Sequence, residues 1–276
     1  MSDSKGMSFR ARMNNMAKAY GLRPQTVIQN YMFERFLERL EKSAFRDNFV
    51  IKGGVLISSI VGLKARSTMD VDTTAVDIPF NIRSIRKAVS SICAGDVGDD
   101  VAFFVLRMER IKLSVDGYGG IRAKLEARFH GLRVPFSIDI TTGDAIAATR
   151  YSYPCHFTEG RRLRLKAYSI ETVLAEKCEA ILQRNVVGTR PRDYYDVYLL
   201  TRLCRVRRTK FRQALMATCE RRGTLAALSE AAAVIDAVES SGTQLEYWRR
   251  FQREFPYARG IEFGEVVKPV RALLLP

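Results

Sequence analysis

The sequence lacks the residues and segments that several large classes of protein require. It contains only two histidines, His130 and His156, so a histidine-based catalytic triad or a His-rich metal site is hard to build. The five cysteines form no CxxC pair, which argues against a zinc site and suits a reducing cytoplasm. No run of eighteen apolar residues occurs, and residues 1–18 are polar with mixed charge. We therefore expect a cytoplasmic globular protein with no membrane partner.

Acidic residues are also scarce relative to basic ones. The chain has 45 Lys and Arg against 30 Asp and Glu, which gives a net charge of +15 over 276 residues. Such an excess favours a polyanionic partner, with nucleic acid first, although a merely soluble cationic surface would give the same count. Arginine, whose planar guanidinium binds phosphate in a bidentate manner, dominates two clusters. The first contains Arg202, Arg205, Arg207, Arg208, Lys210 and Arg212, and the second contains Arg161, Arg162, Arg164 and Lys166.

The hydrophobic pattern changes from mixed to helical near residue 168, and 47% hydrophobic residues are ample for a core. Before this point the pattern predicts helices over 24–42 and 55–61, and strands over 48–51, 101–111, 120–129 and 134–140, with a turn at 116–119. After it the pattern predicts helices over 169–187, 191–203, 210–221 and 224–239, the last capped by Thr224. We therefore expect an α/β (α+β) fold: a mixed β-sheet core with flanking helices in residues 1–167, followed by a C-terminal helical bundle in residues 168–276.

A pair of glycines marks the first candidate binding site. Gly53 and Gly54 follow Lys52 near the start of an expected helix. Without side chains, the backbone can approach a phosphate closely and present N–H groups at the positive end of the helix dipole. The segment therefore predicts a phosphate-binding turn.

A pair of aspartates marks the first candidate catalytic site. Asp70 and Asp72 follow fifteen residues after the glycines, with Arg66 and Thr68 just ahead of them. On an expected strand, residues two positions apart point the same way, roughly 7 Å apart at the backbone. Both carboxylates can then converge on Mg²⁺, which prefers carboxylate and phosphate oxygens. The pattern predicts a magnesium site that serves phosphoryl displacement.

A third carboxylate is expected from the strand over 134–140. Val134, Phe136, Ile138 and Ile140 share one face of this strand, so Asp139 projects from the other face. It could meet the first two aspartates across the sheet, bind metal and help to activate an acceptor hydroxyl. An exposed edge-strand carboxylate without any such role is an equally good interpretation.

These motifs resemble those of a known enzyme superfamily. The order of glycine pair, helix and Arg-x-Thr-x-Asp-x-Asp resembles the signature of the polymerase-β-like nucleotidyltransferases. A helix with glutamate and lysine over 170–177, then Arg184, then an Arg-Asp-x-x-Asp helix over 192–196 narrow the resemblance to the AbiEii/AbiGii family. Its members are nucleotidyltransferase toxins of bacterial abortive-infection toxin–antitoxin pairs. The resemblance covers about residues 25–200 and includes residues 49–54 and 139–144.

The resemblance implies an activity, cofactors and partners. It implies a metal-dependent enzyme that uses Mg²⁺ and an NTP donor to transfer a nucleotide to an acceptor, with RNA, and tRNA in particular, as the best-supported class. It also implies that Lys52, Arg66 and Thr68 help to bind the NTP, and that a separately encoded antitoxin is a partner. The chain departs from the broader superfamily in one respect, because Gly54 stands where a serine hydroxyl often binds phosphate. Gly-Gly is nevertheless common in this toxin family.

The resemblance further implies two active-site residues in the helical part. Lys177 would place a fixed positive charge on the triphosphate, and it lies on an apolar helix face with Val173, Leu174 and Ile181, where a lysine needs a partner. The alternative is that its stem lies along this face and its ammonium group reaches solvent. Asp193 would be an active-site aspartate beside Lys177, but a carboxylate in the first turn of a helix also stabilises the helix dipole without any catalytic role.

Three functions fit these features. The first is a nucleotidyltransferase toxin that acts on RNA. The second keeps the fold but transfers a nucleotide or phosphate to a protein hydroxyl, and the basic charge argues against it. The third is a non-catalytic nucleic-acid-binding module. The intact set of Asp70, Asp72 and Lys177 favours an enzyme.

Overall fold

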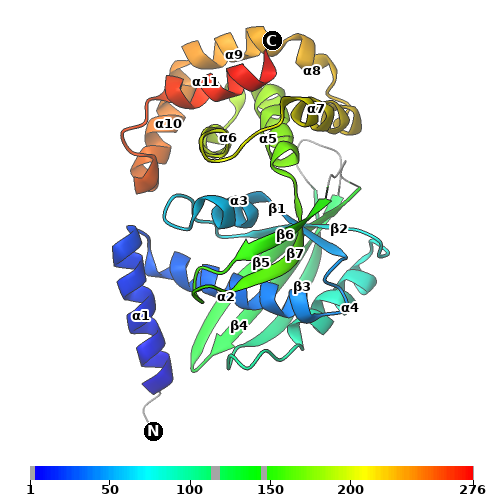
Figure 1. Cartoon of the computed structure of the whole chain (residues 1–276), viewed down its shortest axis with the longest axis vertical. Coiled ribbons are helices and arrows are strands. Elements are labelled where there is room, and N and C mark those ends of the chain that lie inside the picture. Colours follow the sequence, from blue (N-terminus) through cyan, green and yellow to red (C-terminus); the bar gives the residue numbers. More distant parts are fainter. Residues whose placement is uncertain (1–3, 113–118, 144–147, 276) are drawn as a thin grey trace. The chain divides into compact units, whose positions relative to one another are not determined.

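The computed structural model describes residues 4–112, 119–143 and 148–275, which form two units that divide in the sequence between Ala167 and Tyr168 (Figure 1). The first unit contains a seven-stranded sheet in the order β3-β4-β5-β2-β1-β7-β6. Its elements are α1 (Ser4–Tyr20), α2 (Pro24–Lys42), β1 (Phe49–Lys52), α3 (Gly53–Val61), β2 (Val71–Ala75), α4 (Ile82–Cys93), β3 (Ala102–Lys112), β4 (Gly119–Phe129), β5 (Leu132–Thr142), β6 (Ala148–Pro154) and β7 (Arg162–Tyr168). The expected fold class, a mixed sheet with flanking helices and then a helical part, is confirmed.

The sheet is mixed because its central strands run in both directions. β1 pairs antiparallel with β2 and parallel with β7, while β2 pairs parallel with β5. β3, β4 and β5 form an antiparallel meander. Residues 49–51 of β1 are buried, as expected for a short apolar strand with neighbours on both sides.

Helix α2 lies against one face of the sheet. Its bounds match the predicted helix, and the apolar side chains that recur every four residues are all buried. Phe33 of α2 packs edge-on against Phe136 of β5, with ring centroids 5.4 Å apart. Because side chains alternate along a strand, Asp139 and Thr141 lie on the opposite face of β5 from Phe136, as expected from the sequence.

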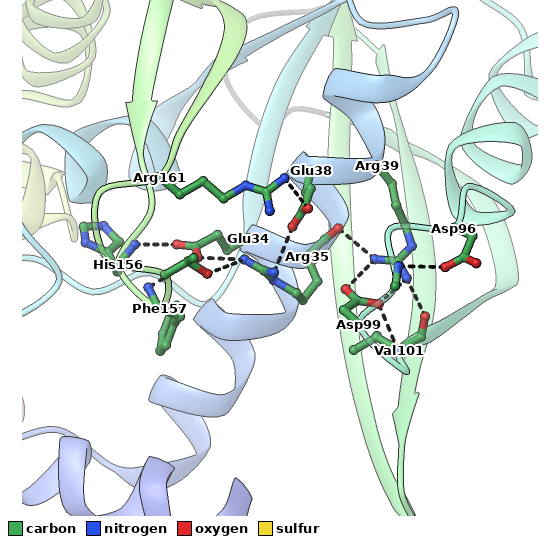
Figure 2. A network of polar contacts seen from close by, with 12 residues as sticks. Glu34, Arg35, Glu38, Arg39, Asp96, Asp99, Val101, His156, Phe157 and Arg161 are labelled. Atoms are coloured by element: carbon green, nitrogen blue, oxygen red, sulfur yellow. Dashed lines mark hydrogen bonds and ion pairs between the residues drawn. The ribbon is translucent and has the colours of Figure 1, made fainter.

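A buried ion network joins α2 to the connection between β6 and β7 (Figure 2). Glu34 of α2 accepts hydrogen bonds from the backbone N–H groups of His156, at 2.6 Å, and Phe157, at 3.3 Å. Arg35 binds Glu34 at 3.0 Å and Glu38 at 2.8 Å, and Arg161 pairs with Glu38. Buried charges are retained only when they are paired, so this network fixes the β6–β7 connection to the helix.

The second unit is helical. Its elements are α5 (Ile170–Arg184), η1 (Asn185–Val187), α6 (Pro191–Leu203), α7 (Arg208–Arg222), α8 (Ala226–Ser229), α9 (Ala231–Ser240), α10 (Gly242–Glu254), η2 (Pro256–Ala258) and α11 (Phe263–Leu274). Trp248 is 1% exposed in the aromatic core of this unit, and its indole N–H donates to the carbonyl of Ile261 at 2.8 Å. Tyr194 and Tyr195 of α6 pack in the same core, against Phe263 and Trp248 respectively.

Four local predictions need correction. Asp70 lies before β2 rather than on it, because the strand begins at Val71. The helix expected over 224–239 is broken into α8 and α9. Thr224 does not cap it, because α8 begins at Ala226 with Leu225 in the N-cap position, and the hydroxyl of Thr224 donates to Glu179 at 3.0 Å. The predicted helix over 169–187 ends at Arg184 and continues as the short 3₁₀ helix η1. Four elements of the first unit, α1, α4, β6 and β7, were not predicted.

Two other expectations concern segments rather than single elements. Most of the turn predicted at 116–119 lies outside the described residues. Among the residues described, no helix combines the length and the apolar character needed to cross a bilayer.

Candidate active site

Four charged side chains form a row across four neighbouring strands of the first unit. The register places Lys52 of β1 opposite Asp72 of β2, Asp72 opposite Asp139 of β5, and Asp139 opposite Arg122 of β4. Residues directly opposite one another share a face of the sheet, with Cβ atoms about 5 Å apart. Three residues predicted from separate motifs, Lys52, Asp72 and Asp139, are therefore neighbours.

Gly53 gives Asp72 the space that its carboxylate occupies. A Cβ added to Gly53 would lie 2.1 Å from Asp72 Oδ2, which is far inside van der Waals contact. Gly53 also has a φ of +58°, in the left-handed region that other residues avoid. Glycine is thus required here for two reasons, and the carboxylate of Asp72 lies directly against the first residue of α3.

Gly54 leaves space in the same way for the side chains of Arg66 and Thr68. A Cβ at Gly54 would lie 2.5 Å from Thr68 Oγ1 and 3.3 Å from Arg66 Nη2. Lys52, the N-cap residue of α3, provides no side-chain cap. The first backbone N–H groups of α3 therefore have no acceptor from the usual capping position, and this is where an anion is stabilised at a helix N-terminus.

Arg66 and Thr68 shape the loop that precedes β2. Both are buried, at 3% and 4% exposure. The hydroxyl of Thr68 donates to the carbonyl oxygen of Asp70 at 3.1 Å and accepts from its N–H at 3.4 Å, while Asn30 donates to the carbonyl of Thr68 at 2.8 Å. These contacts hold the backbone of Asp70, whose side chain is exposed. A direct contact of Arg66 or Thr68 with a nucleotide stays a prediction.

Arg122 is a charged member of the row that sequence reasoning missed. Its Nε and Nη2 atoms donate to the two oxygens of Asp139, both at 2.6 Å. The hydrogen bond to Asp139, with added attraction from the charges of Asp139 and Asp70, raises the pKa of Arg122 above its ordinary value. The side chain of Arg122 is 38% exposed and that of Asp139 is 17% exposed, so the pair lies at the surface of the site.

Two buried threonines fix the position of the Lys52 side chain. Its ammonium group donates to Thr141 Oγ1 at 2.8 Å, and Thr141 in turn lies 3.0 Å from Thr74 Oγ1. Both threonines are buried. This chain of contacts fixes the position of Lys52 on the same face as Asp72.

The carboxylates suit a metal that substrate helps to bind. In the described part of the chain, no three His, Cys, Asp or Glu side chains form a group that could hold a metal ion by itself. Mg²⁺ is commonly held by one or two carboxylates together with substrate phosphates, and Asp70 and Asp72 fit that donor set. Asp139 has one hydrogen bond from Arg122 on each oxygen, so a metal ion at Asp139 would share these oxygens with the guanidinium group, and its role as a metal ligand stays a prediction.

The second unit contains a separate cluster around Lys177 of α5. Its ammonium group lies 2.6 Å from Asp193 Oδ1 and 3.0 Å from Asp196 Oδ2, both on α6. Arg184 at the end of α5 lies 3.5 Å from the other oxygen of Asp193. The side chains of Asp196 and Asp193 are 0% and 8% exposed, while that of Lys177 is 20% exposed. Lys177 thus has the partners that its apolar helix face led us to expect, and it does not extend into solvent alone.

The charge of Asp193 affects the pKa values of two buried neighbours. Burial, with a further contribution from Asp193, raises the pKa of Tyr194 and of Cys178 above their ordinary values. Asp193 lies in the first turn of α6, but its carboxylate pairs with Lys177 and Arg184. Asp196, for which the sequence analysis gave no role, is the more deeply buried partner of Lys177.

The basic cluster over 202–212 is partly used within the second unit. Arg207 binds Glu171 at 2.9 Å, and Arg208 donates to the carbonyl of Ala272. The guanidinium of Arg202 lies 5.0 Å from the ring centroid of Tyr198. These contacts give three of the six cations a structural role.

Comparison with solved structures identifies the class of fold. A protein from H. pylori that is provisionally described as a nucleotidyltransferase is 14% identical, with 92% of this chain and 94% of that one covered and a TM-score of 0.51. An antigenic nucleotidyltransferase-like protein from Paracoccidioides brasiliensis is 17% identical, with 75% and 92% covered and a TM-score of 0.41. The first likeness shows that the chain has a nucleotidyltransferase-like fold. No curated protein matches the sequence.

A family model then identifies the family. The model described as "Nucleotidyl transferase AbiEii toxin, Type IV TA system" matches residues 35–269. The chain therefore belongs to this family of nucleotidyltransferase toxins from type IV toxin–antitoxin systems. The resemblance inferred from the sequence motifs is confirmed, and membership implies an antitoxin as a partner.

Proposed function

We propose that this chain transfers a nucleotide from an NTP to an RNA acceptor, with tRNA as the expected class, and that transfer requires Mg²⁺. The observation that carries the proposal is the contact between Asp72 and Gly53, which unites a carboxylate with the uncapped N-terminus of α3. The net charge of +15 supports a polyanionic acceptor over a protein hydroxyl.

The residues of the first unit divide into donor-binding and acceptor-activating groups. Asp70 and Asp72 hold Mg²⁺, while the first N–H groups of α3, at Gly53 and Gly54, donate to the phosphates of the NTP. When bound, the metal offsets charge on the phosphates. Lys52 lies beside Asp72 and adds a positive charge to the same region.

Asp139 assists the acceptor in this reaction. The oxygen of an acceptor hydroxyl bonds to the α-phosphorus, the bond from that phosphorus to the α–β bridging oxygen breaks, and pyrophosphate leaves. Asp139 accepts the proton of the hydroxyl. Arg122 is a positioning residue, because its two hydrogen bonds orient the carboxylate of Asp139.

Lys177 and Asp193 complete the proposed set. The positive charge of Lys177 offsets charge that develops on the phosphates, and Asp193 orients Lys177 through their 2.6 Å contact. Asp196 holds the same ammonium group from a fully buried position.

The test is to incubate the purified chain with Mg²⁺, total bacterial RNA and each α-³²P-labelled NTP in turn. We expect label on RNA with one NTP, and its loss in Asp70→Asn and Asp72→Asn. Asp77→Asn is the matched control, because Asp77 is exposed and lies just after β2 on the same segment. Label on protein alone would favour a protein acceptor, and no Mg²⁺-dependent label on any acceptor would contradict the proposal.

A further inference from the structure

A cationic cavity lies on the β6–β7 edge of the sheet. It has a volume of about 330 Å³, and its lining includes Arg46, Asp47, Arg150, Arg164 and Lys166. Four cations therefore surround one carboxylate. β6 and β7 are neighbours at the end of the sheet, and the ion network of α2 fixes the connection between them (Figures 1 and 2).

Two of the four cations have no partner in the described part of the chain. Lys166 donates to the carbonyl of Asp47 at 3.0 Å, and Arg46 lies 3.3 Å from the carboxylate of Asp47. Among the described residues, the guanidinium groups of Arg150 and Arg164 contact no acceptor, and both side chains belong to exposed residues. An unpaired guanidinium presents a planar set of N–H donors that matches a phosphate group.

Two cations of the cavity, Arg164 and Lys166, lie on the face of the sheet that carries the catalytic row. Lys166 lies opposite Val50, which is two residues from Lys52 and therefore on the same face of β1, and Lys52 lies opposite Asp72. Arg164 is two residues from Lys166 and also shares this face. Two strand spacings and two residue steps separate Lys166 from Asp72, which corresponds to about 12 Å between Cα atoms.

This separation favours the acceptor over the donor as the ligand. In the proposed function, the phosphates of the NTP lie at the N-terminus of α3, next to Asp72. A second group of phosphate-binding side chains, with Lys166 about 12 Å from Asp72 and the two arginines farther away, suits a longer polyanion whose end lies at the site. A phosphodiester chain has charges at regular intervals, so it can bind the cavity while its end lies at the site beside Asp72.

We propose that the cavity lined by Arg46, Arg150, Arg164 and Lys166 binds the phosphodiester backbone of the acceptor RNA near its reacting end. This inference rests on the proposed function for the identity of the acceptor. Arg150 and Arg164 make the contacts that count most, because in the described residues neither guanidinium group is paired with a carboxylate. Sequence-independent contacts of this kind position a strand without selecting its bases.

The test compares Arg150→Gln/Arg164→Gln with wild type in RNA binding, measured by filter retention from 50 to 300 mM KCl. Two lost phosphate contacts should reduce the slope of log K against log salt by about 1.4 to 1.8, and weaken binding at 0.1 M salt by at least roughly tenfold. The matched control is Arg83→Gln/Arg86→Gln, which removes the same charge from exposed positions on α4. An unchanged slope in the cavity variant, or an equal change in the control, would overturn the inference.

The kinetics of transfer distinguish RNA from NTP as the source of the bound phosphate. They also distinguish failure of this inference from failure of the proposed function. We expect the KM for RNA to rise at least tenfold in the cavity variant, while the KM for the NTP and the kcat at saturating RNA stay within twofold. A rise in the KM for the NTP with no change for RNA would assign the cavity to the donor and overturn the inference. If wild type labels no RNA, the proposed function fails, and the salt slope of binding alone decides whether the cavity holds RNA.

Discussion

Replacing Lys177 by methionine should destabilise the second unit before it reveals anything about catalysis. The substitution keeps most of the side-chain length but removes the charge that lies 2.6 Å from Asp193 and 3.0 Å from Asp196. Breaking a buried ion pair by removing one partner costs about 3–5 kcal/mol, because the other charge stays buried without compensation. We expect a loss at the lower end, about 3 kcal/mol, because Arg184 remains 3.5 Å from Asp193.

The chain contains its own probe for this measurement. Trp248 is the only tryptophan and is buried in the second unit, so its fluorescence reports unfolding of that unit. With a urea dependence of about 2 kcal/mol/M for a unit of this size, the midpoint of the Trp248 transition should fall by about 1.5 M. Lys210→Met is the matched control on exposed α7 and should change stability by less than about 0.5 kcal/mol.

A second variant separates the structural role of Lys177 from its catalytic role. Lys177→Met/Asp193→Asn/Asp196→Asn removes the lysine and both of its carboxylate partners together, so it should recover at least half of the lost stability; Arg184 keeps its charge, but its side chain is 20% exposed. Transfer to RNA should stay abolished in this stable variant. The reasoning would be refuted by a midpoint for Lys177→Met within 0.3 M of wild type, or by a triple variant less stable than the single one.

Three further predictions concern the first unit. Gly53→Ala should lower the free energy of unfolding by about 1–2 kcal/mol because of the positive φ, and should also displace Asp72, so the rate of transfer should fall at least tenfold. Gly62→Ala is the control: this position also has a positive φ, but an added Cβ meets no neighbour, so the variant should lose stability and keep its rate of transfer. Arg122→Met should lower kcat, with partial rescue by Arg122→Lys, while the KM for the NTP and the urea midpoint hardly change; equal kcat values would exclude a positioning role. Burial lowers the pKa of His156, so the unfolded state takes up a proton first as pH falls below about 6.5 and the fold loses stability. Thermal unfolding at pH 7.5 and 5.5 should therefore show a smaller acid loss in His156→Gln than in wild type, and an equal loss would contradict this account.

The fold class and the two best-defined helices were predictable because their signals are local. Apolar residues every four positions gave the bounds of α2, and Pro191 gave the start of α6. α1 left a weaker trace, since only Gly6, Phe9, Met13 and Ala17 are buried along its length, but their spacing of three and four was a usable signal. The break between α8 and α9 lies at Glu230, whose φ of −91° and ψ of 2° depart from helical values, and the apolar pattern of the sequence gives no signal for it.

The candidate site was predictable by residue type but not by partner. Asp72, Asp139 and Lys177 could be chosen from motifs and alternation, since each motif lies on one strand or helix. Arg122 could not, because its role depends on strand register, and register joins residues far apart in the sequence. The choice between Asp193 and Asp196 likewise depends on which face of α6 packs against α5, and the structure pairs both with Lys177.

The central position of β1 sets the order in which a newly made chain can become active. β1 is complete at Lys52, but its parallel partner β7 begins at Arg162, which is 110 residues later. At about 5–20 residues per second, a ribosome needs roughly 6–20 s to make that interval. During this time Lys52 and Asp72 lack the finished sheet, so chains truncated before β7 should be unable to perform the proposed transfer, and activity should appear only after the last strands of the sheet are made.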